Sequence, residues 1–477
     1  MIAVAVAAAA AAVSPAATAA DPATEGSRPT PLNADLVAAV QAISPRRIES
    51  RIQALVAFGT RHTLSDTESN TRGIGAARRW IQREWQGCSA AAGGRLQVTT
   101  DEHLSPVGPR VPRATSIVNV VATLTGDDPQ ARERLLVVSG HYDSRVTDIM
   151  NANADAPGAN DDASGVAAVM EMACVMAHFH YPATLVFMAV AGEEQGLLGA
   201  EHWAAKAKRD GWRVDAMVTN DIIGSPVGDR GQRDAHQVRL FADGLTPLLQ
   251  EAMGQSGSSA GGNNPSIETL KAQILTQVRS GGAADFPPSQ LGRHLKEAGE
   301  RYVPGFTVNL VQRPDRYLRG GDHMPFLARG YAAVRMTEPF ENFEHQHQDV
   351  RTEGAMVFGD LPEFVDYGYV ADVARINLAG LATLALAPAA PRNAFIEVLE
   401  LTNNTTLHWD AVSEAGLAGY RIVWRETGSP VWQGRRDVGN VIRATLALSK
   451  DNLIFGVQSL DADGNASLAI FPLPMRR

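Results

Sequence analysis

Acidic residues and histidines that could bind a divalent metal ion occur at several points along the chain. The first is His141, which Asp143 follows two residues later. A metal-bound histidine usually donates its other ring N–H to a carboxylate or carbonyl group, which fixes the tautomer of the ring. This spacing makes His141 a candidate ligand and Asp143 its supporting acid, although such pairs are also common at solvated surfaces.

Two pairs of neighbouring acids follow. Asp161-Asp162 lies in the segment 157–165, which leads into an apolar helical stretch, and one acid there would suffice as a helix N-cap. Glu193-Glu194 follows an apolar run that predicts a buried strand. Adjacent side chains of an extended chain point in opposite directions, so one glutamate can bind a metal while the other faces a reacting water. A solvated turn is the alternative interpretation of the second pair.

Asp221 and His345 complete the set of candidates. Asp221 has apolar neighbours, and His345 lies in a polar segment, 344–349, that also contains His347. Taken together, the candidates supply two histidines and three carboxylates beside a spare glutamate. This complement is suited to two zinc ions.

The candidate residues stand at the ends of predicted strands. Between about residues 35 and 387, apolar strand-like runs alternate with helical stretches, which predicts a three-layer, doubly wound, mostly parallel α/β sheet. In such sheets ligands bind at the carboxyl ends of the strands. We therefore expect separate segments to converge on one site, because each of these runs leads toward a candidate segment: 135–139, 184–191, 216–220 and 332–336.

These segments resemble the M28 family of co-catalytic zinc peptidases, the aminopeptidases of the bacterial leucyl type. The resemblance covers about residues 140–350, with its motifs in the family order. They are Gly-His-Tyr-Asp at 140–143, the segment 157–165, Gly-Glu-Glu-Gln-Gly at 192–196, Asn-Asp-Ile-Ile-Gly at 220–224, Asp-His-Met-Pro-Phe at 322–326, and His345-x-x-x-Asp349.

The resemblance implies a role for each residue. Glu193 would be the general base, Asp143 the acid behind the first histidine, and the peptide bond between Asp161 and Asp162 would be cis. Each of two zinc ions would have one histidine, one carboxylate of its own and a shared carboxylate. The implied ligands are His141 and Asp221 for one ion, Glu194 and His345 for the other, and Asp161 as the bridge.

Two features depart from the family pattern. The usual His-Thr-Pro of the last motif reads His345-Gln346-His347, which leaves His347 as a rival ligand, although the offset from Asp349 favours His345. The stretch 225–320 is long, and it contains a Gly/Ser/Asn segment at 254–264 and helical patterns at 267–278 and 290–301. It is either a lid over the site or an insertion without a role.

The two ends of the chain differ from the middle. Residues 1–20 are an uncharged, Ala-rich run that ends in small residues, which predicts a signal peptide that lacks a basic start. The protein is then expected to be periplasmic or secreted, with a catalytic domain over 21–387. After a Pro-Ala-Ala-Pro linker, short strand-like runs predict a β-sandwich over 388–477 that resembles a fibronectin type III domain.

Composition excludes other classes of protein. The 477 residues include 43 Lys and Arg against 52 Asp and Glu, a net charge of −9, which argues against nucleic-acid binding. The 45% of hydrophobic residues is typical of a globular protein without a membrane span. Cys88 and Cys174 are too few for a thiolate metal site, and whether they form a disulfide stays open.

The predicted function is an exported di-zinc aminopeptidase that acts on peptides with a free N-terminus. A carboxypeptidase would need a cationic pocket, for which Arg313, Arg316 and Arg319 are candidates unless they pair with nearby acids. A glutaminyl cyclase of this fold would keep a single zinc ion, which the full ligand set disfavours. The same full set, together with the base, disfavours a non-catalytic binding module.

Overall fold

A computed structural model of the chain describes residues 31–252 and 267–475. The predicted signal peptide, 1–20, and the Gly/Ser/Asn segment, 254–264, lie outside the described residues.

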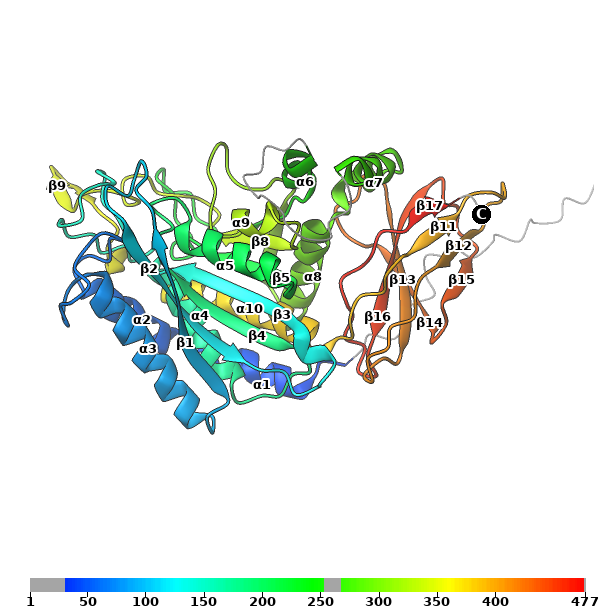
Figure 1. Ribbon diagram of the computed structural model, residues 1–477, viewed down its shortest axis with the longest axis horizontal. Coiled ribbons are helices and arrows are strands. Elements are labelled where there is room, and N and C mark those ends of the chain that lie inside the picture. Colours follow the sequence, from blue (N-terminus) through cyan, green and yellow to red (C-terminus); the bar gives the residue numbers. More distant parts are fainter. Residues whose placement is uncertain (1–30, 253–266, 476–477) are drawn as a thin grey trace, which may run out of the picture.

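An eight-stranded sheet forms the centre of the larger domain (Figure 1), with the strand order β1-β2-β4-β3-β5-β8-β6-β7. The central strands β4, β3, β5 and β8 run parallel to one another. The prediction of a doubly wound α/β fold is confirmed, but the sheet is mixed, because β2 joins β4 and β6 joins β8 in antiparallel fashion. The strands are β1 (Leu96–Ser105), β2 (Thr115–Leu124), β3 (Arg134–His141), β4 (Thr184–Val190), β5 (Arg213–Asn220), β6 (Gln237–Phe241), β7 (Thr307–Val311) and β8 (Ala333–Thr337).

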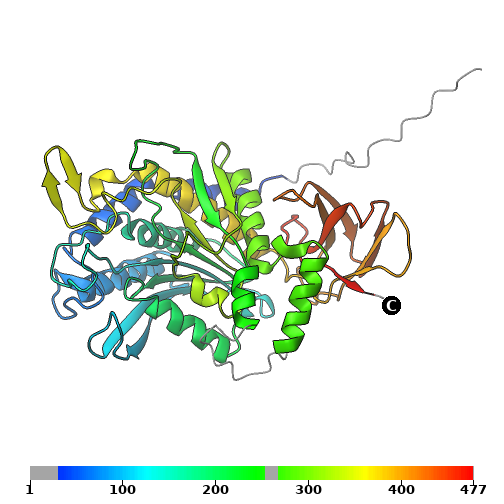
Figure 2. The same cartoon turned by 90° about the horizontal axis from the view of Figure 1, so that it is seen from above.

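Helices cover both faces of this sheet and give three layers (Figure 2). One face carries the main core, to which α1 to α4, α8 and α10 contribute, and the other face carries a smaller core formed with α5 and α9. The helices are α1 (Ala34–Ala42), α2 (Pro45–Val56), α3 (Gly73–Ala91), α4 (Ala163–Met176), α5 (Leu198–Arg209), α6 (Leu245–Ala252), α7 (Ile267–Arg279), α8 (Pro287–Tyr302), α9 (Met324–Leu327) and α10 (Tyr367–Leu386), with short 3₁₀ turns at Ala131–Glu133, Gly282–Ala284 and Pro362–Phe364.

The helix α10 is long and apolar enough to cross a membrane by length and composition. However, 83% of its apolar window is buried inside the protein, where it contacts α8, α4, α2 and α1. We therefore interpret α10 as a core helix of the catalytic domain. It is apolar on nearly all sides because it packs against helices on several sides.

The C-terminal region forms two separate β-sheets, one mixed and one antiparallel, with a core of their own. Leu407, Trp409, Tyr420 and Ile422 are buried in that core, which confirms an all-β domain, whereas its likeness to fibronectin type III stays a prediction. One sheet contains β11 (Phe395–Glu397), β12 (Thr405–His408), β15 (Arg443–Leu446) and β17 (Leu473–Met475), and the other contains β13 (Gly419–Glu426), β14 (Gly434–Gly439) and β16 (Leu453–Leu460). The hairpin of β9 (Arg351–Glu353) and β10 (Met356–Phe358) belongs to the larger domain.

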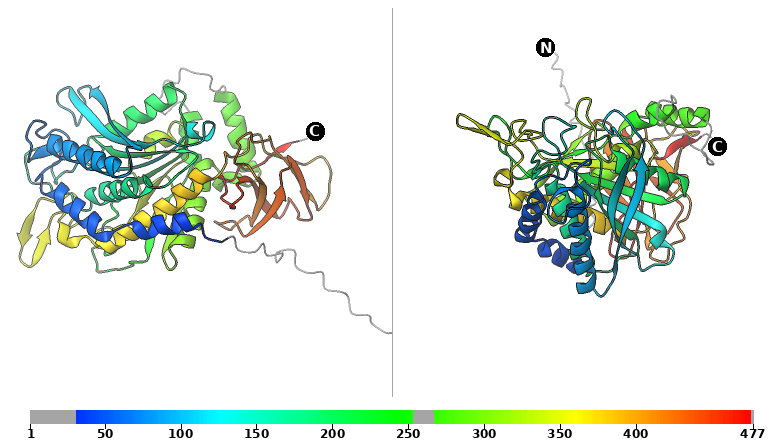
Figure 3. Two further views of the ribbon diagram at one scale, coloured as in Figure 1. Left: turned by 90° about the horizontal axis from the view of Figure 1, so that it is seen from below. Right: turned by 60° about the vertical axis from the view of Figure 1, so that its left-hand side comes forward.

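The helices α7 and α8 match the two helical patterns predicted within the long stretch 225–320. Figure 3 shows α7 beside the C-terminal domain, and α7 contacts β17. The buried Asp285, between the two helices, pairs with Arg293 of α8 and with Arg425 of β13. These contacts give α7 and α8 a connecting role between the two domains.

Candidate metal centre and active site

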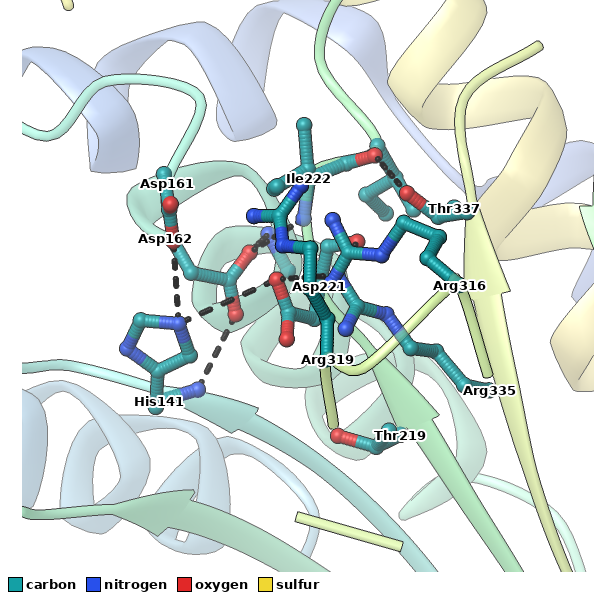
Figure 4. A network of polar contacts seen from close by, with 12 residues as sticks. His141, Asp161, Asp162, Thr219, Asp221, Ile222, Arg316, Arg319, Arg335 and Thr337 are labelled. Carbon is teal, nitrogen blue, oxygen red and sulfur yellow. Dashed lines mark hydrogen bonds and ion pairs between the residues drawn. The ribbon is translucent and has the colours of Figure 1, made fainter. Parts of the chain in front are cut away.

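The candidate residues converge at the carboxyl ends of neighbouring parallel strands. His141 is the last residue of β3, the Glu193-Glu194 pair follows β4, and Asp221 follows β5. Asp161 lies two residues before α4, in the loop between β3 and α4. Figure 4 shows His141, Asp161 and Asp221 directed toward one another.

Two groups of donor atoms share one carboxylate. In the first, Nε2 of His141 lies 3.0 Å from Oδ1 of Asp161 and 3.9 Å from Oδ1 of Asp221. In the second, Nε2 of His347 lies 2.8 Å from Oδ2 of Asp161 and 3.0 Å from Oε1 of Glu194. The two oxygens of Asp161 therefore face different histidines, which is the arrangement of a bridging carboxylate.

His345, which the sequence favoured as a ligand, belongs to neither group. Its ring instead stacks on Phe364, with ring centroids 3.6 Å apart and an interplanar angle of 8°. His347 takes the place expected of His345, and its backbone has a φ of 57°, in the left-handed region. Residues held in this region are frequent at functional sites, because the surrounding structure must compensate their strain. The second donor group therefore contains the rival His347 and not His345.

Asp143 supports both His141 and the glutamate pair. Nδ1 of His141 lies 3.1 Å from the backbone carbonyl of Asp143 and 3.6 Å from its Oδ1, which leaves Nε2 directed at the carboxylates. Asp143 also accepts hydrogen bonds from the backbone N–H groups of Glu193 (3.3 Å) and Glu194 (3.1 Å). Burial acts to raise the pKa of Asp143, but its bonds from His141, the Thr63 hydroxyl and Glu194 outweigh it and lower the pKa.

Asp162 holds the loop rather than facing the donor groups. Its carboxylate accepts the backbone N–H of Gly165 (2.9 Å), as the N-cap of α4, and that of His141 (3.0 Å). The peptide bond between Asp161 and Asp162 is cis, as predicted. The loop also needs Gly158, because a side chain there would approach Arg61 and the Asp161 carbonyl within 3 Å, and its φ is +51°.

Several supporting residues were missed by sequence reasoning. The fully buried Arg61 donates to the backbone carbonyls of Tyr142 (2.8 Å), Pro157 and Gly158 (2.8 Å). Asp360 accepts the backbone N–H groups of Asn160 (2.8 Å) and Asp161 (2.7 Å). These residues come from segments without a family motif, and a charged residue in a turn or loop gives no sequence signal of burial.

The electrostatics of the site favour a bound cation. Burial acts to lower the pKa of His347, yet Glu194 and Asp161 outweigh it and raise the pKa to about 10. The pKa of His141 is likewise raised well above its usual range, against its burial, by Asp143 and Asp161. Imidazole and carboxylate donors in groups of three suit zinc, so the residues present fit two zinc ions.

Glu193 lies beside the donor groups without belonging to either. The residue is half-buried, and burial of its carboxyl raises the pKa well above the ordinary value, with Glu194 and Asp221 adding repulsion. Bound cations would offset this repulsion and favour the ionised form. Glu193 is therefore a candidate base next to the candidate metal centre.

The three arginines considered for a substrate carboxylate have partners within the protein. Arg316 and Arg319 both pair with Glu341, at 2.9 and 2.7 Å. The guanidinium group of Arg313 lies over the ring of Tyr317, 3.6 Å from its centroid. These contacts agree with the structural role that the sequence left open for them.

Comparisons with known proteins identify the class. The model of peptidase family M28 matches residues 119–271. A probable zinc metalloprotease of Leptosphaeria maculans is 45% identical over 94% of this chain and 98% of its own length. A probable zinc metalloprotease of Pyricularia oryzae is 49% identical over 93% of this chain and 85% of its own.

The chain therefore belongs to peptidase family M28, and it is a zinc-dependent peptidase. Among solved structures, the LapA aminopeptidase of Legionella pneumophila has the same fold, with a TM-score of 0.50 at 16% identity over 76% of this chain and 78% of that one.

Proposed function

We propose that this peptidase is an exported di-zinc aminopeptidase that removes N-terminal residues from peptides. One observation carries the proposal of two ions: each oxygen of Asp161 faces a different histidine. Each histidine also faces a carboxylate that the other does not, Asp221 for His141 and Glu194 for His347. A centre for a single ion, as expected of a glutaminyl cyclase, would use only one of these two donor groups, and the other would bind no metal.

The proposed reaction is hydrolysis of the first peptide bond. When bound, two zinc ions supply Lewis-acid polarisation of the scissile carbonyl and lower the pKa of the attacking water. The Glu193 carboxylate takes a proton from that water and delivers it to the departing amine, a role worth roughly 10²–10⁴-fold in rate. Asp143 holds the backbone on which Glu193 and Glu194 stand, so it positions the base relative to the ligands.

The direction of cleavage is inferred from the charges around the site. A free α-amine of the substrate is favoured by a site rich in carboxylates, such as Glu193, Glu194 and Asp221. A substrate carboxylate would need a cation, yet Arg316 and Arg319 are paired with Glu341. The similar fold of a protein described as an aminopeptidase agrees with this direction.

Export is supported by the cysteines. Cys88 and Cys174 form a disulfide that links α3 to α4. Disulfides persist mainly in oxidising compartments outside the cytosol. Together with the predicted signal peptide, this favours a periplasmic or secreted enzyme.

A panel of aminoacyl chromogenic amides, assayed with and without a chelator, tests this proposal. We expect hydrolysis that the chelator abolishes and added Zn²⁺ restores, and no hydrolysis of the same compounds acetylated at the α-amine. Peptides amidated at the C-terminus should be cleaved as well as free ones. If acetylated peptides were cleaved and amidated ones were not, the enzyme would be a carboxypeptidase.

A further inference from the structure

A guanidinium group lies directly behind one of the candidate zinc ligands. Arg335, on β8, has no exposed surface, and its Nη2 lies 2.9 Å from Oδ1 of Asp221. This is the same oxygen that lies 3.9 Å from Nε2 of His141. Figure 4 shows Asp221 between His141 on one side and Arg335 on the other. A cation of the protein thus already occupies one side of this carboxylate.

Arg335 is fixed in this position by groups on its far side. Its Nη1 lies 3.2 Å from Oδ2 of the buried Asp315 and donates to the Gly320 carbonyl at 2.9 Å. A side chain at Gly321 would come within 3.1 Å of both Arg335 and Asp221, so glycine permits the close approach of this loop. Burial acts to lower the pKa of Arg335, but Asp221 and Asp315 outweigh it, so the guanidinium stays charged.

The other donor group has no comparable cation. Among the described residues, the ion pairs of Glu194 and Asp161 are with histidines, and no lysine or arginine is paired with either carboxylate. Arg110 approaches Glu194, but it donates to the backbone carbonyl, at 2.9 Å. The two halves of the centre therefore have similar donor atoms and different surroundings.

We propose that Arg335 is a positioning residue that makes the two zinc sites unequal, because it holds Asp221 and weakens the binding of the ion on the His141 side. A carboxylate shared with a guanidinium donates less charge to a metal, and the fixed positive charge repels the incoming ion. The site of Glu194 and His347 then fills first, and the site of His141 and Asp221 fills second. This inference rests on the proposed di-zinc function and deepens it.

Titration of the metal-free, full-length protein with Zn²⁺ in the presence of a competing chelator tests the inequality. We expect two ions to bind in separate stages, with affinities roughly 10–100-fold apart, the range that groups behind the ligands usually control. Asp221→Asn should remove the weaker stage and His347→Asn the tighter one. Absorption of bound Co²⁺ reports the same two stages independently of activity.

Variants of Arg335 separate its charge from its hydrogen bonds. Arg335→Gln keeps a donor toward Asp221 but removes the positive charge that repels the ion, so it should tighten the weaker stage roughly tenfold or more and leave the other almost unchanged. Arg335→Lys keeps the charge and should keep the two stages apart. Circular dichroism checks that each variant is folded. If Arg335→Gln does not fold, the order of filling is decided by the titrations of the wild type, Asp221→Asn and His347→Asn.

The outcomes distinguish this inference from the proposed function. Two ions bound with equal affinity would overturn the inequality and leave the di-zinc peptidase intact. A weaker second stage in folded Arg335→Gln would show that Arg335 strengthens the site, contrary to the proposal. A wild-type protein that takes up only one ion would overturn the di-zinc function and the inequality together.

Discussion

Glu193 and Glu194 are adjacent in the chain, yet they have different surroundings. Glu194 lies 3.0 Å from His347 within a donor group, whereas Glu193 keeps partial exposure beside it. We expect Glu193→Gln to bind zinc as the wild type does and to lose roughly 10²–10⁴-fold in kcat, because the amide cannot take up a proton. Metal analysis and steady-state kinetics measure the two effects separately.

The neighbouring variant Glu194→Gln is the matched control for that experiment. It makes the same chemical change one residue later, and it should lose zinc as well as turnover. Near wild-type turnover in Glu193→Gln would show that the base is another group.

The two histidines of the last motif give a second prediction. His347→Ala should lose one zinc ion and nearly all activity, because it removes a donor atom from the second group. His345→Ala should keep both ions and lose only the stacking on Phe364, worth about 0.5–1.5 kcal/mol of stability. Zinc content and thermal unfolding of the two variants test this, and loss of zinc in His345→Ala alone would restore the ligand favoured by the sequence.

At the residue scale, the sequence indicated the candidate donor residues that follow regular strands, but not which histidine of the irregular last motif joins the second donor group. His141 and Asp221 follow directly from β3 and β5, so their positions could be inferred from strand patterns. His347 lies in a turn with a left-handed backbone, and no periodicity predicts which way such a side chain points. Arg335 could not be predicted either, because it reads as one charged residue within an otherwise apolar strand.

At the scale of elements, one buried acid joins α2 to α4 on the core face of the sheet. Glu171 of α4 has no exposed side-chain surface; it accepts the backbone N–H of Ser44 at 2.9 Å and pairs with Arg47 and Arg51. Burial acts to raise the pKa of Glu171, but these partners lower it below its ordinary value of 4.5. The link therefore contributes stability whenever the carboxylate is ionised.

Glu171→Gln should destabilise the protein at neutral pH by about 3–5 kcal/mol, because Arg51 stays buried without a counter-charge. Since the pKa is lower in the folded state, this stability is fully present above about pH 4.5 and is lost as the pH falls toward the folded value. The gap between wild type and variant in urea unfolding should therefore be largest near neutral pH and shrink in acid. A gap that does not change with pH would contradict this account.

The exposed Glu84 of α3 provides the control for this charge change. Glu84→Gln should alter the free energy of unfolding by less than about 0.5 kcal/mol at either pH.

The same scale shows which elements the sequence could predict. The apolar strands β3, β4 and β5 contain most of the predicted strand-like runs, and α4 is the apolar helix expected after 157–165, because buried elements carry a continuous apolar pattern. The strand β14 contains Arg435, Arg436 and Asp437, and no apolar pattern predicts it, since it forms by pairing with β13 at a sheet edge. The apolar run 466–471 would suggest a strand by its composition, but it makes only isolated bridges, to Val457 and Leu460. The strand β17 begins two residues after this run, at Leu473–Met475.

At the scale of the whole molecule, a buried ion cluster fixes the C-terminal domain to the catalytic domain. Asp285 is fully buried between Arg293 and Arg425, and Trp432 lies over both guanidinium groups, at 5.3 and 5.9 Å. The curated relatives align over more than nine-tenths of this chain, so they include this domain. The C-terminal domain is thus a built-in part of the fold.

Asp285→Asn should make the two domains unfold independently. It leaves two buried guanidinium groups without their shared carboxylate, at a cost of about 3–5 kcal/mol. We expect calorimetry to show two transitions in place of one and limited proteolysis to cut the linker at 388–391. Glu297→Gln, which breaks an exposed pair with Arg435 across the same interface, should cost at most about 1 kcal/mol. A single unchanged transition in Asp285→Asn would show that apolar contacts alone hold the domains together.

The central position of α10 also sets the order in which the protein can fold. During synthesis, α1, α2 and α4 emerge well before α10, since α4 ends at Met176 and α10 begins at Tyr367, yet all three pack against it. Their apolar faces stay uncovered until nearly the whole catalytic domain has been made, and such nascent chains are prone to aggregate. A chain whose core closes this late would stay open to a translocation channel during synthesis, as the export proposed above requires.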